Sequence, residues 1–442
     1  MAANENLELA RWACDQAKRA GAQEARASVS RTRDTSLEYR ERKIETLQES
    51  TVKGLSLSFY TDGRYSAHRT SDLRRQALEK FIRESVALTK HLTEDPYRRL
   101  PEPEYYEGRR DMDLQLFDAA QKQIVADDRH RVAREIEDAA LSRGGDKIIS
   151  VTAGYSESNS ESAMVSTNGF EGAQERTNFW CGAEVTAKDD GDKRPEDWWW
   201  EGERYRGDLT DAATIGRKAV DRALSRVGAD KIPTGEVPVI IENRAAGRIL
   251  RFYGGAFQAR NLQQKRSFLE GKQGEQVASA HLSVFDDPFI VRGQGSRLYD
   301  GEGIAARRMP ILERGVLQNF YIDTYYGRKL KMRATTGGPS NTVFECDVVK
   351  SVDQWMAELG RGILITGFLG GNSNSSTGDF STGIQGFLFE NGKIHQPIAA
   401  MNIAGNHLEF WHKLLGMGDD PYRYSSVRSP SLVFDSMVIA GA

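Results

Sequence analysis

The sequence contains few cysteines, which limits the kinds of site that the chain can build. Cys14, Cys181 and Cys346 are the only three among 442 residues, and no two of them form a Cys-x-x-Cys pair. Three cysteines so few and so far apart do not form a disulfide scaffold, and they are typical of reduced thiols in a cytoplasmic protein. Cys181 and Cys346 fall in predicted strands, where a free cysteine usually acts as a small buried hydrophobe.

Long apolar runs and an excess of charge are also absent. No stretch approaches the roughly 20 apolar residues of a membrane helix, and the N-terminal segment lacks the apolar region of a secretory signal. The 60 basic and 63 acidic side chains leave a net charge of −3. We therefore expect a cytoplasmic protein that binds neither membranes nor nucleic acid.

Common catalytic motifs are missing as well. The segment GQGSR at 293–297 does not fit the Gly-x-Ser-x-Gly turn of a serine hydrolase, and Gly271-Lys272 lacks the glycine spacing of a phosphate-binding loop. His407 and His412 are five residues apart on a predicted helix, so they point about 140° away from one another. We expect structural or surface roles for both histidines.

Alternating apolar residues in the N-terminal half predict an antiparallel sheet with one buried face. A first strand is predicted at 24–29, followed by separate alternating segments and a hairpin at Asp62-Gly63. Further strands are predicted at 147–156, 162–167 and 170–185, and helices at 7–20, 72–91, 114–141 and 211–226.

Proline placement suggests how the chain is divided. Three prolines make residues 95–113 an extended linker or a crossing loop, and Pro233-Thr234-Gly235 is the best domain boundary. The predicted fold class is α+β. An N-terminal domain over 1–232 carries an antiparallel sheet with packed helices, and 236–442 form a β-rich C-terminal domain. Brief helices are predicted in that second domain at 246–256, 353–359 and 406–414.

An ordered set of short motifs runs through nearly the whole chain. The N-terminal half contains SLEYRERKIETLQES, and the C-terminal half contains GEQVAS, FDDP, YDGEG, GVLQNFYIDTYYGRKL, GDFSTGIQGFLFENGKI and GDD. Together these motifs resemble the TldD/PmbA family, and most closely its PmbA side, also called TldE. The resemblance implies a member that lacks the family's zinc motif and accompanies a zinc-bearing TldD subunit in a peptidase complex.

The catalytic members of that family carry a His-Glu-x-x-x-His motif on a helix that the segment 237–261 resembles. The alignment places Arg251 at the first His, Phe252 at the Glu and Ala256 at the second His. A zinc hydrolase needs imidazoles to hold the metal and a carboxylate to move a proton. The family's cysteine ligand near the C-terminus is missing too. We therefore expect no catalytic residue, metal or cofactor in this chain, and zinc in the partner subunit.

The resemblance implies a role in peptide processing. The chain would complete the substrate chamber and support a TldD-like zinc-bearing subunit, with a possible homodimer when it is alone. It would be catalytically inactive without that partner. Two alternatives remain open: a self-associating peptide-binding protein without a protease partner, and a modulator of DNA gyrase, which an older family name implies.

Three features are candidates for binding. The glycine-rich segment 367–383 is predicted to be either a groove that binds an extended peptide through its main chain or an ordinary surface loop. Its candidate contact residues are Gly370, Gly371, Asn372, Asn374, Gly378 and Asp379. The run Trp198-Trp199-Trp200 suits a subunit interface or a substrate stack, with core packing of at least one ring favoured. Arg307 and Arg308 suit an acidic partner, although a solvated strand face is the default interpretation.

Overall fold

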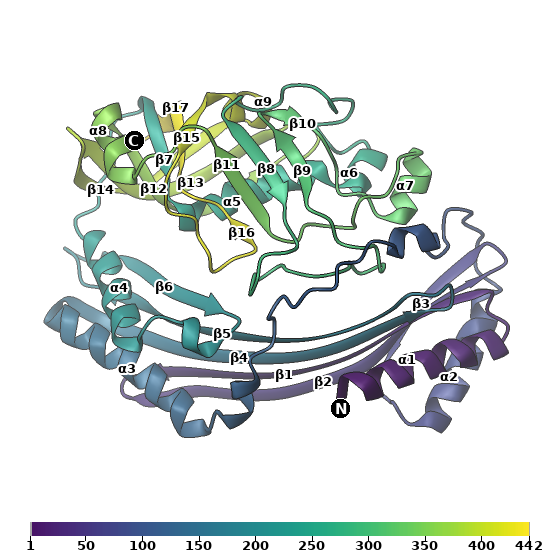
Figure 1. The fold of residues 1–442 in the computed structure, drawn as a ribbon. Helices are drawn as coiled ribbons and strands as arrows, with labels where there is room; N and C mark the ends of the chain where they lie inside the picture. Colours follow the sequence, from purple (N-terminus) through teal and green to yellow (C-terminus); the bar gives the residue numbers. More distant parts are fainter. Residues whose placement is uncertain (1, 442) are drawn as a thin grey trace.

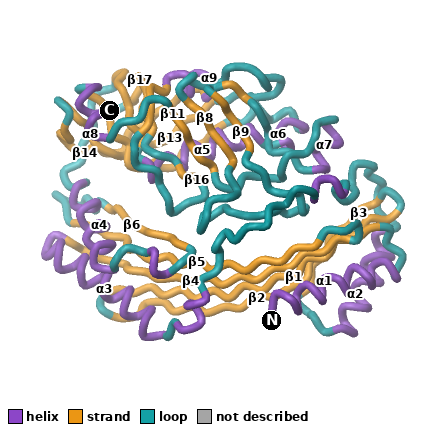
Figure 2. Tube along the Cα trace, viewed as in Figure 1, coloured by secondary structure: helices purple, strands orange, loops and turns teal. Residues whose placement is uncertain are grey.

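The computed structural model describes residues 2–441 and has two layers (Figure 1). A long, curved antiparallel sheet from the N-terminal half carries helices on its outer side, and the β-rich C-terminal half lies over its inner side (Figure 2). The predicted α+β class is confirmed. None of the helices among the described residues combines the length and the apolar character needed to cross a membrane.

The N-terminal sheet has six antiparallel strands in the order β3-β2-β1-β4-β5-β6. Their bounds are β1 Glu24–Arg40, β2 Lys43–Thr61, β3 Arg64–Thr70, β4 Ile148–Ser166, β5 Glu171–Ala187 and β6 Glu196–Glu203. The prediction of several short segments in place of β1, β2 and β4 was wrong. In the middle of β1 and β4, polar residues occupy both faces, so the apolar alternation stops while the backbone ladder continues. In β2 the residues from Lys43 to Lys53 are solvent-facing, so they carry no alternation either.

Helices cover the outer side of this sheet in two pairs. Their bounds are α1 Ala2–Arg19, α2 Arg75–Thr89, α3 Ala126–Gly144 and α4 Ala212–Ser225. The helices α1 and α2 pack into one hydrophobic core at one end of the sheet, and α3 and α4 pack into another at the opposite end. The predicted start of the third helix at 114 was wrong. There the Asp118 carboxylate caps a short 3-10 helix at Ala119–Gln123 by accepting the N–H of Ala120, and it also accepts the N–H of Arg206. The α-helix itself begins only at Ala126.

The C-terminal half contains two sheets with the orders β10-β9-β8-β11-β16 and β14-β13-β12-β7-β17-β15. Pairing of β14 with β17 closes the second sheet into a small barrel. The strands are β7 Gly235–Ile241, β8 Leu282–Asp286, β9 Met309–Glu313, β10 Val316–Leu317, β11 Thr342–Cys346, β12 Arg361–Ser373, β13 Asp379–Glu390, β14 Lys393–Asn406, β15 Leu414–Met417, β16 Val427–Arg428 and β17 Leu432–Ala440.

Five helices accompany these strands: α5 Asn243–Gly254, α6 Ala259–Gln263, α7 Thr324–Leu330, α8 Val352–Leu359 and α9 His407–Phe410. Sequence reasoning missed α6 and α7, because five and seven residues are too few for a helical period to show. The Asp323 carboxylate caps α7 by accepting the N–H of Tyr326.

Residues 95–113 form an irregular segment between the two halves, with one short 3-10 turn at Pro103–Tyr106. Arg328 of α7 donates to the carbonyls of Tyr97, Arg99 and Leu100. It also forms an ion pair with Glu102. The segment is therefore held against the C-terminal half.

Candidate functional site

The helix α5 follows the buried strand β7 directly and forms one wall of a cavity between the two halves of the chain. Its inner side packs into the large C-terminal core through Ala246, Ile249 and Tyr253. Its other side presents arginines to a cavity of about 880 Å³, which also meets β5, β6, β12 and the segment 422–427. The lining residues used below are Trp198, Trp200, Arg244, Arg248, Arg251 and Thr366.

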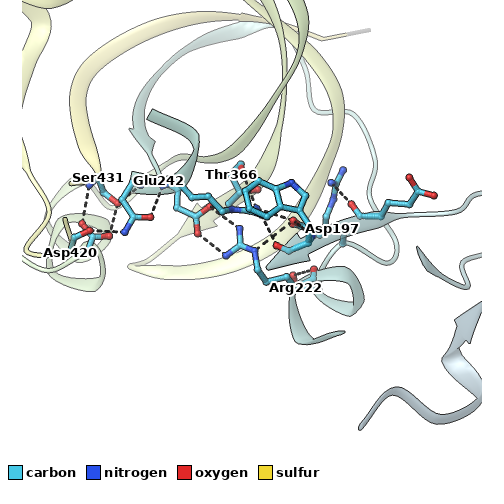
Figure 3. A network of polar contacts seen from close by, with 12 residues as sticks. Asp197, Arg222, Glu242, Thr366, Asp420 and Ser431 are labelled. Atoms are coloured by element: carbon cyan, nitrogen blue, oxygen red, sulfur yellow. Dashed lines mark hydrogen bonds and ion pairs between the residues drawn. The ribbon is translucent and has the colours of Figure 1, made fainter. Parts of the chain in front are cut away.

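A buried ion-pair network fixes the start of α5 to the N-terminal sheet (Figure 3). The Arg244 guanidinium, only 3% exposed, donates to the Asp197 carboxylate of β6 at 2.8 Å and to the carbonyl of Trp198. It also lies 4.1 Å from the Trp198 ring centre. Arg222 of α4 makes two hydrogen bonds to Glu242, the residue before α5, at 2.8 and 2.7 Å.

A second set of contacts holds the same helix end to the loop before β17, the strand that pairs with β7. The Asn243 amide donates to the carbonyl of Asp420, and the Asn243 N–H donates to the Ser431 hydroxyl. The carboxylate of Asp420 in turn accepts both the N–H and the hydroxyl of Ser431. The position of α5 is thus determined by α4, β6 and the loop before β17 together (Figure 3).

The three residues aligned with the family's zinc motif lie on or just after α5. Arg251 is exposed and lines the cavity, Phe252 packs against the core, and Ala256 is fully buried in the 3-10 turn after the helix. A guanidinium, a phenyl ring and a methyl group do not bind zinc or transfer a proton from water. Among the described residues, no three His, Cys, Asp or Glu side chains are placed to hold a metal.

The glycine-rich segment is a β-hairpin, so its interpretation as a long loop was wrong. The strands β12 and β13 extend to Ser373 and from Asp379, and only 374–378 form the turn. A bulge between Leu369 and Asn372 accommodates Gly370 and Gly371, both with positive φ. From the sequence these glycines were assigned to a loop, but in the structure they permit a bulge inside a strand.

The six candidate residues of this hairpin differ in exposure. Gly370, Gly371, Asn372, Asn374 and Asp379 are exposed, whereas Gly378 is buried. A Cβ atom at Gly378, where φ is +86°, would lie 3.2 Å from Phe268 and Asn406. Asp379 accepts hydrogen bonds from Thr377 and Asn406, so it stabilises the turn.

Beyond residue 365, the edge of β12 that faces α5 pairs with no other strand in the described part of the chain. The strand β7 pairs with β12 only at residues 363–365, and Arg248 of α5 donates to the carbonyl of Gly370 at 2.9 Å. The exposed end of the hairpin thus adjoins the wall of the cavity. Sequence reasoning missed Arg244, Asp197 and Thr366, because no local pattern distinguishes residues whose partners lie over 40 positions away.

The three tryptophans of β6 divide between the two faces of the sheet. Trp199 packs against the core under α4, as was favoured for at least one of them, while Trp198 and Trp200 line the cavity. Arg307 and Arg308 are exposed but precede β9 instead of lying within a strand. Arg308 pairs with Glu345 at 2.7 Å and with Asp287 at 3.6 Å, so its charge is met within the chain.

The nucleophile and ligand candidates examined from sequence occupy structural positions. His407 is buried among aromatic rings, while His412 is exposed. Burial raises the pKa of Cys14 and Cys181 to about 12 each. The Ser296 hydroxyl is buried and donates to the carbonyl of Ile290.

Models of the PmbA/TldA metallopeptidase family match three consecutive parts of the chain. They are domain 1 at 25–89, the central domain at 120–227 and the C-terminal domain at 234–441. The first two matches share the single N-terminal sheet, and the third coincides with the β-rich half.

Named relatives and solved structures agree with these matches. Metalloprotease PmbA of Escherichia coli O157:H7 is 28% identical over 421 residues, which cover 94% of this chain and 92% of that protein. A PmbA homolog of Haemophilus influenzae is 27% identical over 97% of this chain and 95% of its own. A candidate modulator of DNA gyrase from Bacteroides thetaiotaomicron is 39% identical, covers 100% of both chains and has a TM-score of 0.96. TldE of Thermococcus kodakarensis shares the fold, with a TM-score of 0.84 at 20% identity over 99% of this chain and 100% of its own.

Proposed function

Because the chain belongs to the PmbA/TldD family as a PmbA-like member, we propose that it is the non-metal subunit of a two-subunit metallopeptidase. In this proposal it completes the substrate chamber of a TldD-like, zinc-bearing subunit. The observation that carries the proposal is the residue set Arg251, Phe252 and Ala256 at the C-terminal end of α5, the helix that forms one wall of the cavity.

The chemistry of this site supports binding over catalysis. Hydrolysis of a peptide bond requires an activated water or an activated side-chain nucleophile. The guanidinium of Arg251 and the phenyl ring of Phe252 offer neither a zinc ligand nor a general base, and burial raises the pKa of the Cys14 and Cys181 thiols. The cavity instead offers cationic and aromatic side chains, which recognise and orient a ligand.

An extended peptide suits the free edge of β12. Strand addition satisfies backbone groups of both chains, and residues 367–373 carry an edge that β7 does not cover. The proposed contacts are Gly370, Gly371, Asn372, Asn374 and Asp379. Gly378 contributes through the shape of the turn beneath them.

A photo-crosslinking amino acid at Asn372 should label a substrate peptide in the assembled complex. The same group at Arg83, an exposed residue of α2 on the outer side of the sheet, serves as the control. We expect peptide adducts from position 372 only, identified by mass spectrometry. Adducts of equal yield from both positions, or from 83 alone, would show that the hairpin is only a connector.

The chain should form a stable dimer with a zinc-bearing family member. Obligate interfaces typically bury on the order of 2,000 Å² or more, so the complex should survive dilution to nanomolar concentrations. Mass photometry after co-expression measures this directly. A homodimer that does not bind the candidate partner would favour the self-associating peptide-binding alternative. A monomer under all conditions would contradict the subunit proposal.

The gyrase-modulator alternative has support only in the names of relatives, one of which covers the full chain. The net charge of −3 provides no field to attract DNA or its complexes. We therefore place the peptide role first.

A further inference from the structure

A second cavity, of about 530 Å³, lies between the inner face of the N-terminal sheet and the loops of the C-terminal half. Strands β1, β2, β4 and β5 form its floor, and the segments 294–301 and 339–340 cover it. Gln294 and Ser426 line both this cavity and the α5 cavity, so the two adjoin. Arg251, Phe252 and Ala256, the residues aligned with the zinc motif, do not line it.

Three arginines that line this cavity have no carboxylate partner among the described residues. Arg26 of β1, Arg176 of β5 and Arg297 line its wall, and none of them forms an ion pair within the part of the chain that the structure describes. Arg176 meets only the Gln174 amide oxygen and the carbonyl of Ser296. Arg297 meets the Thr336 hydroxyl and the carbonyl of Gly338.

Two of these guanidinium groups also have unused donors. Arg26 Nη1 and Arg176 Nε are buried without a hydrogen-bond acceptor among the described residues. An unmatched buried donor costs free energy, and an unmatched buried charge costs more. Burial accordingly lowers the pKa of Arg176, and burial together with nearby Arg176 lowers the pKa of Arg204, just behind it, to about 10.

The acidic group in the wall is already engaged. Asp300 accepts the N–H groups of Glu302 and Ile304 on one oxygen, and the Thr336 hydroxyl and the Gly337 N–H on the other. The wall therefore has three cations against one anion. Serine hydroxyls and an amide complete it, at Ser28, Ser56, Ser58, Ser162 and Gln174.

We propose that this cavity binds a carboxylate of a peptide, held by Arg26, Arg176 and Arg297. Guanidinium groups bind carboxylates through short, charge-assisted hydrogen bonds, and a ligand carboxylate would supply the acceptors that Arg26 and Arg176 lack. The cavity adjoins the α5 cavity, so a peptide along the proposed hairpin edge reaches it. This inference rests on the proposed peptide role for the ligand class, but not on any hydrolysis.

Direct binding to the purified chain tests the proposal. The probes are three hexapeptides measured by isothermal titration calorimetry. The first probe has two glutamates and four serines, with an acetylated N-terminus and an amidated C-terminus. The second has the same blocked ends, with glutamines in place of the two glutamates. The third also has glutamines in place of the glutamates, but its C-terminal carboxylate is free. We expect the glutamine peptide with blocked ends to bind at least about tenfold more weakly than a carboxylate-bearing one. The two carboxylate-bearing probes distinguish a side-chain acid from a peptide C-terminus.

Variants separate binding from folding. Arg176→Gln and Arg26→Gln should each weaken binding of the carboxylate-bearing peptide at least about tenfold. Arg31→Gln, an exposed arginine on the same strand as Arg26, should leave it unchanged. Without peptide, Arg176→Gln should melt at the same temperature as the parent chain or higher, because it removes an unmatched buried charge.

Equal binding of the neutral peptide, or unchanged binding by both glutamine variants, would overturn the proposal. A large loss of melting temperature in Arg176→Gln without ligand would also overturn it, because the arginine would then be structural. These outcomes leave the subunit proposal intact, since that depends on the partner complex.

Discussion

Replacing Asp197 with alanine is expected to lower the free energy of unfolding by about 3–5 kcal/mol, because it leaves the buried Arg244 guanidinium without its nearest carboxylate. Asp197 and Arg244 are 4% and 3% exposed and only 2.8 Å apart. The substitution weakens the contact between β6 and the start of α5, so the two halves of the chain should separate more readily. Urea denaturation followed by tryptophan fluorescence measures the change.

Two controls show whether the unpaired charge of Arg244 causes the loss of stability. The pair Arg143–Asp221 has a similar distance of 2.8 Å but lies on the surface, with side chains 57% and 51% exposed. Asp221→Ala should therefore change stability by less than about 1 kcal/mol. Combining Asp197→Leu with Arg244→Met should recover much of the loss, since neither charge of that pair remains and Arg222 keeps Glu242 as its partner. A stability equal to that of the parent chain in Asp197→Ala alone would contradict the assigned role of the network.

Lowering the pH from 7 to 4 should cost about 3 kcal/mol of stability through His407 alone. Burial among Tyr253, Phe268, Phe380 and Trp411 lowers the pKa of His407 to about 4. Below a pH of about 6.5 the unfolded chain binds a proton at this residue that the folded chain does not. The contribution is therefore complete above that pH and is lost as the pH falls toward 4.

Carboxylates also titrate in this range, so the informative quantity is the difference between variants. In His407→Phe the slope of stability against pH between 6.5 and 4 should be smaller than in the parent chain. His412→Gln, at an exposed position five residues away, should keep the parent slope. Equal slopes in the parent chain and His407→Phe would show that His407 accepts a proton in the folded state.

The order of the elements was predictable where local patterns are strong. The helix α4 begins after Asp211, whose side chain caps it, and the hairpin at Asp62 and Gly63 has positive φ at both residues, as the Asp-Gly pair predicts. These features depend on neighbours in the chain, which a single sequence displays.

Features set by distant partners were not predictable. The long central parts of β1 and β4 carry polar or charged residues on both faces, and only pairing with neighbouring strands makes them continuous. The same limit applied to the site. The family resemblance located Arg251 and Phe252, but the buried Asp197–Arg244 pair and the arginines of the second cavity come together only through the tertiary fold.

Peptide hydrolysis by reconstituted subunits tests the central claim most directly. Three samples are compared with a fluorogenic unfolded-peptide substrate: this chain alone, a zinc-bearing family member alone, and the two mixed. We predict no cleavage by this chain alone and the highest activity in the mixture, abolished by a zinc chelator and restored by zinc. Robust, chelator-insensitive cleavage by this chain alone, lost on a single substitution, would contradict the claim.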